Sequence, residues 1–387
     1  MSPYEDLLVP DGTHLLHIGP HKTGSTAIQV SMHAARERLG AHGVYYAGGA
    51  ARPKHAGWAI GLMGRPAGSA VPPIHHWNEL VEEVTSATAP RVCISNEDFG
   101  RADAAQRRRI VDDLGGGRPH VVAVARRLDR YLPSQWQERI KAGDTRSYDE
   151  WLRSVLDLDN PEGSWDRTNV WRAHDTARLV ANWVEVVGEE NLTLIVGDES
   201  DRMQLLHSFE GLLGLPQGTL KSHPDRSNRG LSWGEAELVR AVNLACQERG
   251  WSRDQRNAYV KKGVIRSLLQ REAVDSGPRT PPLPAWAADV VRRLSDERAT
   301  AVQAMGVRVV GDPTHLRVPA DIAVSEGELE LPALPPHIAA EAVAGVIGRA
   351  LSQKPGRRPA EPERSDGDGV PSRAERLARR VRDRLGS

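Results

Sequence analysis

A short apolar stretch that runs into a tight turn constrains the fold of this chain more than any other feature. Residues 15–19 predict a buried strand, the turn that follows places Lys22 between two glycines, and Ser25 and Thr26 open a helical pattern. A strand, a tight turn and a helix in this order direct several backbone N–H groups and a helix N-terminus to one point, where an anionic group can bind. The segment therefore predicts a phosphate-binding loop at the start of an α/β domain.

The residue types inside this turn strengthen the interpretation. Lys22 adds a mobile positive charge, and the hydroxyl groups of Ser25 and Thr26 add hydrogen-bond donors. The chain has only 7 lysines among its 51 basic residues, so a lysine at this position is not a consequence of composition.

The rest of the chain alternates between strand-like and helical patterns. Further strands are predicted at residues 44–46, 91–95, 120–125 and 192–196, and helices at 25–39, 77–86, 104–114, 149–156, 175–187, 205–213 and 233–249. Strands that alternate with helices form a doubly wound, mostly parallel sheet flanked by helices. Ligands bind to such sheets at the carboxyl ends of the strands, where Gly19, Glu97 and Arg126 fall.

We expect one α/β domain over residues 1–320, which includes a helical C-terminal part at about 232–306. Residues 321–352 predict a Pro-rich segment with a short helix, and residues 353–387 a disordered, charged tail. A basic helix over 373–385 would allow weak peripheral contact with an anionic membrane, although a solvated tail explains the composition more simply.

Charge and cysteine content argue against several classes of protein. The 51 basic and 51 acidic residues of the 387-residue chain cancel, which argues against a nucleic-acid-binding protein that relies on bulk charge. Cys93 and Cys246 are too few for a disulfide framework, and no cysteine and histidine cluster predicts a metal site, the His75-His76 pair included. Residues 1–12 lack the apolar core of a signal peptide, and no run approaches the ~18 apolar residues of a membrane span, so a cytoplasmic protein is expected.

A second anion-binding pattern follows the strand at residues 120–125. Arg126 comes directly after this strand, and Ser134 follows eight positions later, near the next helix. A guanidinium fork and a hydroxyl are donors suited to a dianionic phosphate. Arg127 and Arg130 are nearby alternatives to Arg126 for this role.

The loop sequence Gly19-Pro-His-Lys22-Thr-Gly24-Ser-Thr resembles the 5′-phosphosulfate loop of the sulfotransferase superfamily, whose members use 3′-phosphoadenosine 5′-phosphosulfate (PAPS). In nucleoside-triphosphate-binding loops the lysine follows the second glycine, whereas here it precedes Gly24. The resemblance implies that PAPS is the co-substrate and that no metal is needed. It also implies a set of contacts to the phosphosulfate group from His21, Lys22, Thr23, Gly24, Ser25 and Thr26.

Two further segments carry the same resemblance. The spacing of Arg126 and Ser134 is similar to that of the arginine and serine with which sulfotransferases hold the 3′-phosphate. The usual Arg-Asn-Pro or Arg-Asp-Pro sequence is absent after Arg126. A later segment, Ser-Asn228-Arg229-Gly230-Leu, resembles a loop that closes over this phosphate. The resemblance implies contacts to the phosphate from Asn228 and Arg229. Many bacterial members have serine at the position of Gly230. Because glycine has no hydroxyl group, this chain cannot make a hydroxyl contact there.

The reaction that the resemblance implies is in-line transfer of a sulfuryl group from PAPS to a hydroxyl or amine of a small-molecule, glycan or lipid acceptor. Lys22 would donate to the bridging oxygen of the leaving phosphate. Glu97, at the end of a strand expected between the loop and the Arg126 strand, is the candidate general base, with a pKa raised by desolvation. The alternatives for the base are Asp98, His21 and His55.

Two other functions are open at this point. A phosphotransferase or NTPase would need a Mg²⁺-binding carboxylate at a second strand end, for which Glu97 and Asp98 are the candidates. A catalytically inactive nucleotide-binding scaffold is the third interpretation, and the presence of Lys22, Arg126 and Ser134 argues against it. The candidates to line an apolar acceptor site are Trp58, Trp77, Trp165 and Trp171.

Overall fold

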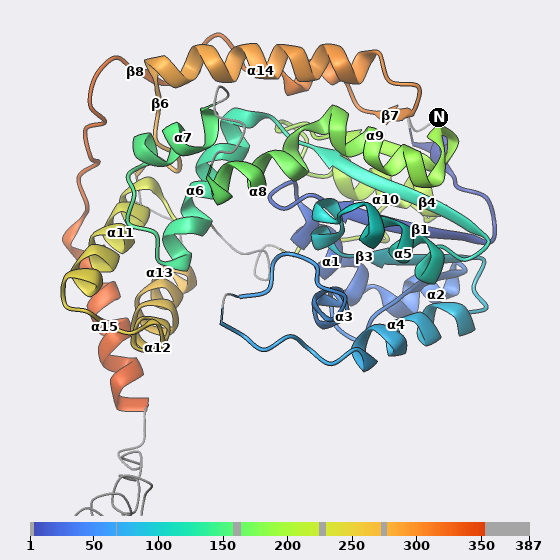
Figure 1. Ribbon diagram of the computed structural model, residues 1–387, viewed down its shortest axis with the longest axis horizontal. Helices are drawn as coiled ribbons and strands as arrows, with labels where there is room; N and C mark the ends of the chain where they lie inside the picture. Colours follow the sequence, from blue (N-terminus) through green and yellow to red (C-terminus); the bar gives the residue numbers. More distant parts are fainter. Residues whose placement is uncertain (1–3, 67, 158–163, 224–229, 272–276, 353–387) are drawn as a thin grey trace, which may run out of the picture. The chain divides into compact units, whose positions relative to one another are not determined.

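The computed structural model describes residues 4–66, 68–157, 164–223, 230–271 and 277–352 (Figure 1). The chain divides into two compact units, Met1–Arg349 and Ala350–Ser387, and the elements that build the site belong to the first. The expected charged tail over 353–387, with its basic helix, lies outside the described residues.

A six-stranded sheet in the order β2-β3-β1-β4-β5-β7 forms the centre of the first unit, and every neighbouring pair of strands is parallel. The strands are β1 (Thr13–Gly19), β2 (Val44–Tyr46), β3 (Arg91–Ser95), β4 (Arg118–Ala125), β5 (Leu192–Val196) and β7 (Arg308–Val310). The predicted α/β fold with a mostly parallel sheet is confirmed. The edge strand β7, a run of 3 residues, was not predicted.

The strand order corrects one expectation about the site. β1, which leads into the loop, lies between β3 and β4, so the strand that precedes Glu97 is not the middle one. The chain crosses β1 on its way from β3 to β4, and this crossover cannot be read from local patterns. Because β1 is central, the loop lies beside the carboxyl ends of both neighbouring strands.

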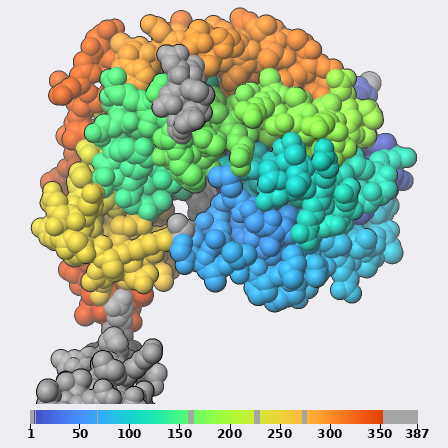
Figure 2. Space-filling view, viewed as in Figure 1, coloured from blue at the N-terminus to red at the C-terminus, as the bar shows by residue number. Residues whose placement is uncertain are grey.

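Side chains of each central strand alternate between two hydrophobic cores, one on each face of the sheet. Leu15 packs with α1, α2 and α10, whereas the adjacent Leu16 packs with α4, α5, α9 and α14. Figure 2 shows α14, α9 and α5 side by side on one surface. The helices of the two layers are α1 (Ser25–Ala34), α2 (Arg36–Ala41), α10 (Gln204–Leu213), α4 (His75–Ser86), α5 (Ala104–Leu114), α9 (Thr176–Val187) and α14 (Ala285–Gln303).

A third hydrophobic core joins helices that extend beyond the sheet and includes the fully buried Trp136 and Trp151. These helices are α6 (Leu128–Ala142), α7 (Tyr148–Leu156), α8 (Trp165–His174), α11 (Trp233–Glu248), a π-helix (Asn257–Ile265), α13 (Arg266–Gln270) and α15 (Pro336–Ser352). The short helix α12 (Arg253–Arg256) leads into the π-helix. The helical C-terminal part is therefore observed as α11 to α14. Among the described residues, no helix combines the length and apolar character needed to cross a membrane.

Short elements complete the first unit. They are α3 (Lys54–Ala59), the 3-10 helices η1 (Glu5–Leu7), η2 (Glu97–Arg101), η3 (Glu189–Asn191) and η5 (Pro313–Leu316), and the paired strands β6 (Leu283–Pro284) and β8 (Val324–Ser325). α3 lies inside the segment 48–73, for which the sequence analysis predicted no helix. η2 follows β3 directly and carries Glu97 and Asp98 to the edge of the sheet where the loop lies.

Candidate functional site

The loop over residues 19–26 has the backbone of an anion-binding turn. Gly19, Lys22 and Gly24 all have positive φ angles, of 79°, 68° and 102°. A Cβ on Gly19 would lie 2.6 Å from the Cβ of Glu97, so no larger residue fits where the loop passes η2. Gly24 precedes α1 as its N-cap and offers no side chain to cap the helix, so the first N–H groups of α1 face the loop without a side-chain acceptor.

Two of the three predicted hydroxyl donors are used inside the loop itself. Thr23 Oγ1 and Ser25 Oγ both donate to the carbonyl of Pro20, at 2.7 and 3.3 Å. These bonds hold the turn closed and leave the Thr26 hydroxyl, which is exposed, as the donor directed to solvent. The backbone N–H groups and Thr26 are therefore the donors that this loop offers to a ligand.

Lys22 points from the loop to α6. Its Nζ forms an ion pair with Glu138 Oε1, and the same carboxylate also binds Lys141. Burial raises the pKa of Glu138, but the two lysines outweigh it and lower this pKa to about 2. Burial lowers the pKa of Lys22, with help from the nearby charges of Lys141 and Arg126. An anion that binds to Lys22 must compete with a carboxylate that is ionised at any physiological pH.

Arg126 reaches the same loop from the end of β4. Its Nη1 donates to the Lys22 carbonyl at 3.0 Å, and its Nε and Nη2 bind both oxygens of Glu199, at 2.6 and 3.1 Å. Arg127 and Arg130, by contrast, pair with Asp129 at 2.9 and 3.7 Å. Among the three arginines that the sequence offered for this role, Arg126 is the one whose guanidinium contacts the loop.

Ser134 lies in the second turn of α6 and is half-buried. Ser134 lies one helical turn before Glu138, so the two side chains project from the same face of α6. Glu138 on this face binds Lys22. The Ser134 hydroxyl makes no hydrogen bond to any residue that the structure describes. The other two predicted phosphate ligands, Asn228 and Arg229, lie outside the described residues.

Glu97 and Asp98 form a charged cluster beside the loop. His21 Nε2 lies 2.8 Å from Asp98 Oδ1, and its Nδ1 lies 3.8 Å from Glu97 Oε1. Arg52 bridges the two carboxylates, binding Glu97 through Nη1 and Asp98 through Nη2 at 2.6 Å. Trp58 Nε1 also donates to Asp98, at 3.1 Å. Gln29 Nε2 donates to Glu97 Oε2, so both oxygens of each carboxylate face a donor or a cation.

The expectation that desolvation raises the pKa of Glu97 is wrong. Burial does raise this pKa, but Arg52, His21 and the amide of Gln29 together hold it below the usual value. The pKa of Asp98 is low for the same kind of reason, since His21, Arg52 and Arg101 outweigh its burial. Burial and Arg101 lower the pKa of His21, although Asp98 opposes them. At neutral pH the cluster therefore holds two carboxylates and a neutral imidazole.

Arg52 is the residue of this cluster that the sequence did not indicate. It comes from the segment 48–73, in which the sequence analysis singled out His55 and Trp58 but not Arg52. Its partners are 45 and 46 positions away along the chain. The remaining candidate base, His55, packs its ring against Trp58 and His76 at centroid distances of 5.5 Å.

His75, His76 and Glu79 bring their ligand atoms within 4.8 Å of one another at the start of α4. The histidine pair was considered without Glu79 in the sequence analysis. His75 and Glu79 are exposed, and His76 is half-buried.

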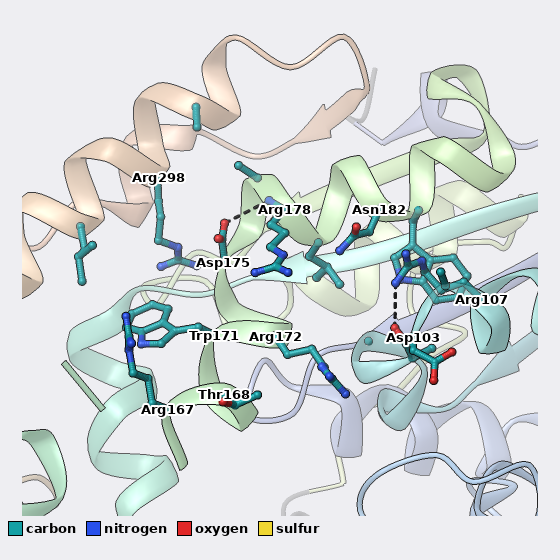
Figure 3. Close-up of a pocket in the computed structure, with 18 of the residues that line it drawn as sticks. Asp103, Arg107, Arg167, Thr168, Trp171, Arg172, Asp175, Arg178, Asn182 and Arg298 are labelled. Atoms are coloured by element: carbon teal, nitrogen blue, oxygen red, sulfur yellow. Dashed lines mark hydrogen bonds between the residues drawn. The ribbon is translucent and has the colours of Figure 1, made fainter. Parts of the chain in front are cut away.

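A cavity of about 810 Å³ opens on the other side of η2, between α5, α8, α9 and α14 (Figure 3). Trp171 and Trp183 line it, as do five arginines: Arg107, Arg167, Arg172, Arg178 and Arg298. Only Trp171 among the predicted acceptor-site tryptophans belongs to it. The other three lie elsewhere: Trp58 beside Asp98, Trp77 on the buried face of α4, and Trp165 exposed on α8.

No protein-family model matches this chain, and a search of curated proteins finds no similar sequence. Among solved structures, the chain is similar to a sulfotransferase from Alicyclobacillus acidocaldarius, with 15% sequence identity and a TM-score of 0.35. The match covers 62% of this chain and 95% of the other. The two proteins are distant, and the function proposed below depends on the residues of the site.

Proposed function

We propose that this protein is a sulfotransferase that moves a sulfuryl group from PAPS to a hydroxyl or amine of a small-molecule, glycan or lipid acceptor. One observation carries the proposal. Arg126 donates to the carbonyl of Lys22 at 3.0 Å, so a second phosphate-binding cation lies against the loop that resembles a phosphosulfate loop. PAPS has two separate phosphate groups, and two cations on neighbouring strand ends match that requirement.

The residues of the loop divide the work of the transfer among them. In the reaction the acceptor oxygen or nitrogen forms a bond to sulfur while the bond from sulfur to the phosphate oxygen breaks. The uncapped N-terminus of α1 and the Thr26 hydroxyl would bind the phosphosulfate oxygens. Lys22 would leave Glu138 and donate to the departing phosphate, where negative charge increases. Arg126 would bind the 3′-phosphate, with Ser134 as a further donor from α6.

The acceptor must also lose a proton, and two groups beside the loop can take it. Glu97 holds the predicted position, but its low pKa makes it a weak base. His21 is neutral at physiological pH, is partly exposed, and is oriented by its 2.8 Å contact with Asp98. These observations favour His21 as the base. Glu97 and Asp98 would then orient both His21 and Arg52.

The alternative of a Mg²⁺-dependent phosphotransferase has less support. Its metal would need a carboxylate at the end of a second strand, and Glu97 and Asp98 are the residues there. Both are already bound to Arg52, and Asp98 also accepts from Trp58. A cation that occupies the place of a metal ion argues for chemistry without Mg²⁺ at this point.

Calorimetry with nucleotides tests the proposal before any acceptor is known. We expect 3′-phosphoadenosine 5′-phosphate to bind at least tenfold more tightly than 5′-AMP, because Arg126 contributes a charge-assisted contact. We also expect Mg²⁺ to leave this affinity unchanged. Tighter binding of ATP with Mg²⁺ would instead favour the phosphotransferase. A screen of acceptors with labelled PAPS then identifies the class of acceptor, and label transfer to none of them would favour the inactive scaffold.

A further inference from the structure

We propose that the cavity between α5, α8, α9 and α14 is a second binding site, which takes a small organic polyanion. It is called the arginine cavity below, after Arg107, Arg172, Arg178 and Arg298. The proposal does not depend on the proposed sulfotransferase activity, because it uses residues outside the loop.

The four arginines of this cavity make no direct ion pair with a carboxylate of the described residues. Among the residues that the structure describes, no carboxylate oxygen lies within 4.0 Å of the guanidinium of any of these four arginines. Two arginines on the same helices behave differently. Arg108 pairs with Glu185 at 3.6 Å, and Arg293 pairs with Glu297 at 3.1 Å. Ion pairs therefore form around the cavity, while the arginines inside it are left without one.

The acidic residues that line the cavity are occupied by other groups. Asp103 caps α5 by accepting from the Gln106 N–H at 2.8 Å. Asp175 caps α9 by accepting from the Arg178 N–H at 3.1 Å (Figure 3). Glu297 is bound to Arg293.

Two of the cavity arginines are buried. Arg107 is 7% exposed, and its only described hydrogen bond is from Nη1 to the carbonyl of Ala102, at 2.9 Å. Its Nε is buried without a partner. Arg298 is 8% exposed and binds only neutral oxygens, those of Thr176 and the Arg126 carbonyl. Burying a guanidinium without an anion costs free energy, which a bound anion would offset.

The remaining cavity wall indicates an organic ligand with a flat or cyclic body. Figure 3 shows Arg178 and Arg298 extending from α9 and α14 in the same direction, toward the level of Trp171 on α8. Trp171 is half-buried, so part of its ring is open to a ligand. The volume of about 810 Å³ is that of a site for a small organic molecule. Guanidinium forks favour carboxylate, sulfate or phosphate groups, and several of them are needed to meet several arginines.

The arginine cavity and the 19–26 loop are separated by η2. Gly100 of η2 lines the cavity on one side, and a Cβ built on it would lie 2.8 Å from the Ile18 carbonyl oxygen on the other. The side chains of Glu97 and Asp98 turn from η2 to Arg52 and His21, on the side of the loop. A ligand in the cavity would therefore leave Lys22 free to bind a nucleotide.

Titration of the full chain with trimesate, the symmetric benzene tricarboxylate, tests the proposal. Tryptophan fluorescence and calorimetry report binding, and the matching benzene trisulfonate and benzene tris-phosphate show which anion the cavity prefers. We expect saturable binding of at least one of the three, and binding of the single-charged benzoate at least tenfold weaker. Absence of saturable binding of all three at millimolar concentration would overturn the proposal.

Paired variants locate the bound probe. Arg172→Gln combined with Arg178→Gln removes two exposed arginines of the cavity, and we expect a loss of affinity of at least tenfold. The matched control combines Arg109→Gln and Arg292→Gln, which lie on α5 and α14 and pair with Asp113 and Asp289, two carboxylates outside the cavity lining. We expect a change of less than about twofold. Equal losses in both double variants would show non-specific charge attraction and overturn the proposal.

Competition with nucleotide separates this site from the loop. We expect 3′-phosphoadenosine 5′-phosphate to leave the affinity for the probe unchanged, and Lys22→Ala to leave it unchanged as well. Competitive displacement by the nucleotide, together with loss of probe binding in Lys22→Ala, would mean that the probe binds in the loop. That result would overturn the second site without affecting the proposed sulfotransferase activity.

Discussion

The 19–26 loop and the arginine cavity both gather positive charge, but they treat it in opposite ways. Around the loop three cations each bind a carboxylate: Lys22 binds Glu138, Arg126 binds Glu199, and Arg52 binds Glu97 and Asp98. In the cavity, no described carboxylate pairs with Arg107, Arg172, Arg178 or Arg298.

The difference has a consequence for how each region would bind an anion. At the loop, a phosphate must replace a carboxylate, so binding exchanges one ion pair for another and depends on geometry more than on net charge. In the cavity, an anion binds guanidinium groups that have no ionic partner, so the net charge of the anion contributes directly to its affinity. Variants in the two regions should therefore respond differently, and the following predictions test that comparison.

Replacing Lys22 should produce the largest effect. Lys22→Ala removes the cation that would stabilise the leaving phosphate, so sulfuryl transfer should fall by about 10³-fold. Turnover with labelled PAPS and an acceptor from the screen measures this loss. Lys141→Ala is the matched control, since Lys141 binds the same Glu138 but lies on α6. Turnover of Lys22→Ala within tenfold of wild type would remove Lys22 from the mechanism.

Two substitutions decide which group accepts the proton. His21→Asn should lower kcat by about 10²-fold and remove the acid limb of the pH–rate profile. Glu97→Gln breaks the pair with Arg52, so it should lower the melting temperature and affect kcat less. Loss of the acid limb in Glu97→Gln alone would show instead that Glu97 is the base, as the sequence predicted.

Replacing Arg126 should weaken one class of nucleotide only. Arg126→Gln should reduce the affinity for 3′-phosphoadenosine 5′-phosphate by about 30-fold, the loss expected for one charge-assisted clamp. Binding of 5′-AMP, which lacks the 3′-phosphate, should not change. Arg127→Gln is the control, because Arg127 pairs with Asp129 and does not contact the loop. Equal losses for both nucleotides in calorimetry would assign Arg126 a structural role.

Acid should destabilise the strand beneath the loop. His17 in β1 is fully buried, and burial lowers its pKa to about 4 in the folded protein. In the unfolded chain the pKa of histidine is about 6.5, so between about pH 6.5 and 4 the unfolded chain binds more protons than the folded protein. The contribution of His17 to stability is therefore fully present above this pH range and is lost as the pH falls through it. Urea unfolding should show that His17→Gln removes about 1.4 kcal/mol per pH unit from this dependence. An unchanged slope would mean that other groups set it.

Removing the competing carboxylate should give the smallest effect. Glu138→Gln frees Lys22 from its ion pair, so the affinity for 3′-phosphoadenosine 5′-phosphate should rise by about three- to fivefold. Glu185→Gln, on α9 beside Arg108, is the control and should change nothing. Weaker binding in Glu138→Gln would show that this carboxylate orients Lys22 rather than competing for it.

Local sequence determined the parts of this protein that depend on neighbouring residues. The strands at 44–46, 91–95 and 192–196 were predicted with the bounds observed, and the turn around Lys22 was predicted from its glycines and the helix that follows. Hydrophobic period, glycine placement and helix starts are set within a few residues, so a single sequence carries them. The order of the strands in the sheet could not be predicted from local sequence, because the crossover from β3 to β4 joins distant segments.

Tertiary structure alone decided the partners of the charged residues. The sequence placed Glu97 at a strand end, but only the fold brings Arg52 and His21 to it, and these reverse the direction of its pKa. The ion pair of Lys22 with Glu138 joins residues 116 positions apart. The arginine cavity collects side chains from four helices that share no motif. Electrostatic interactions act through distance in space, and distance in space is set by packing rather than by position in the chain.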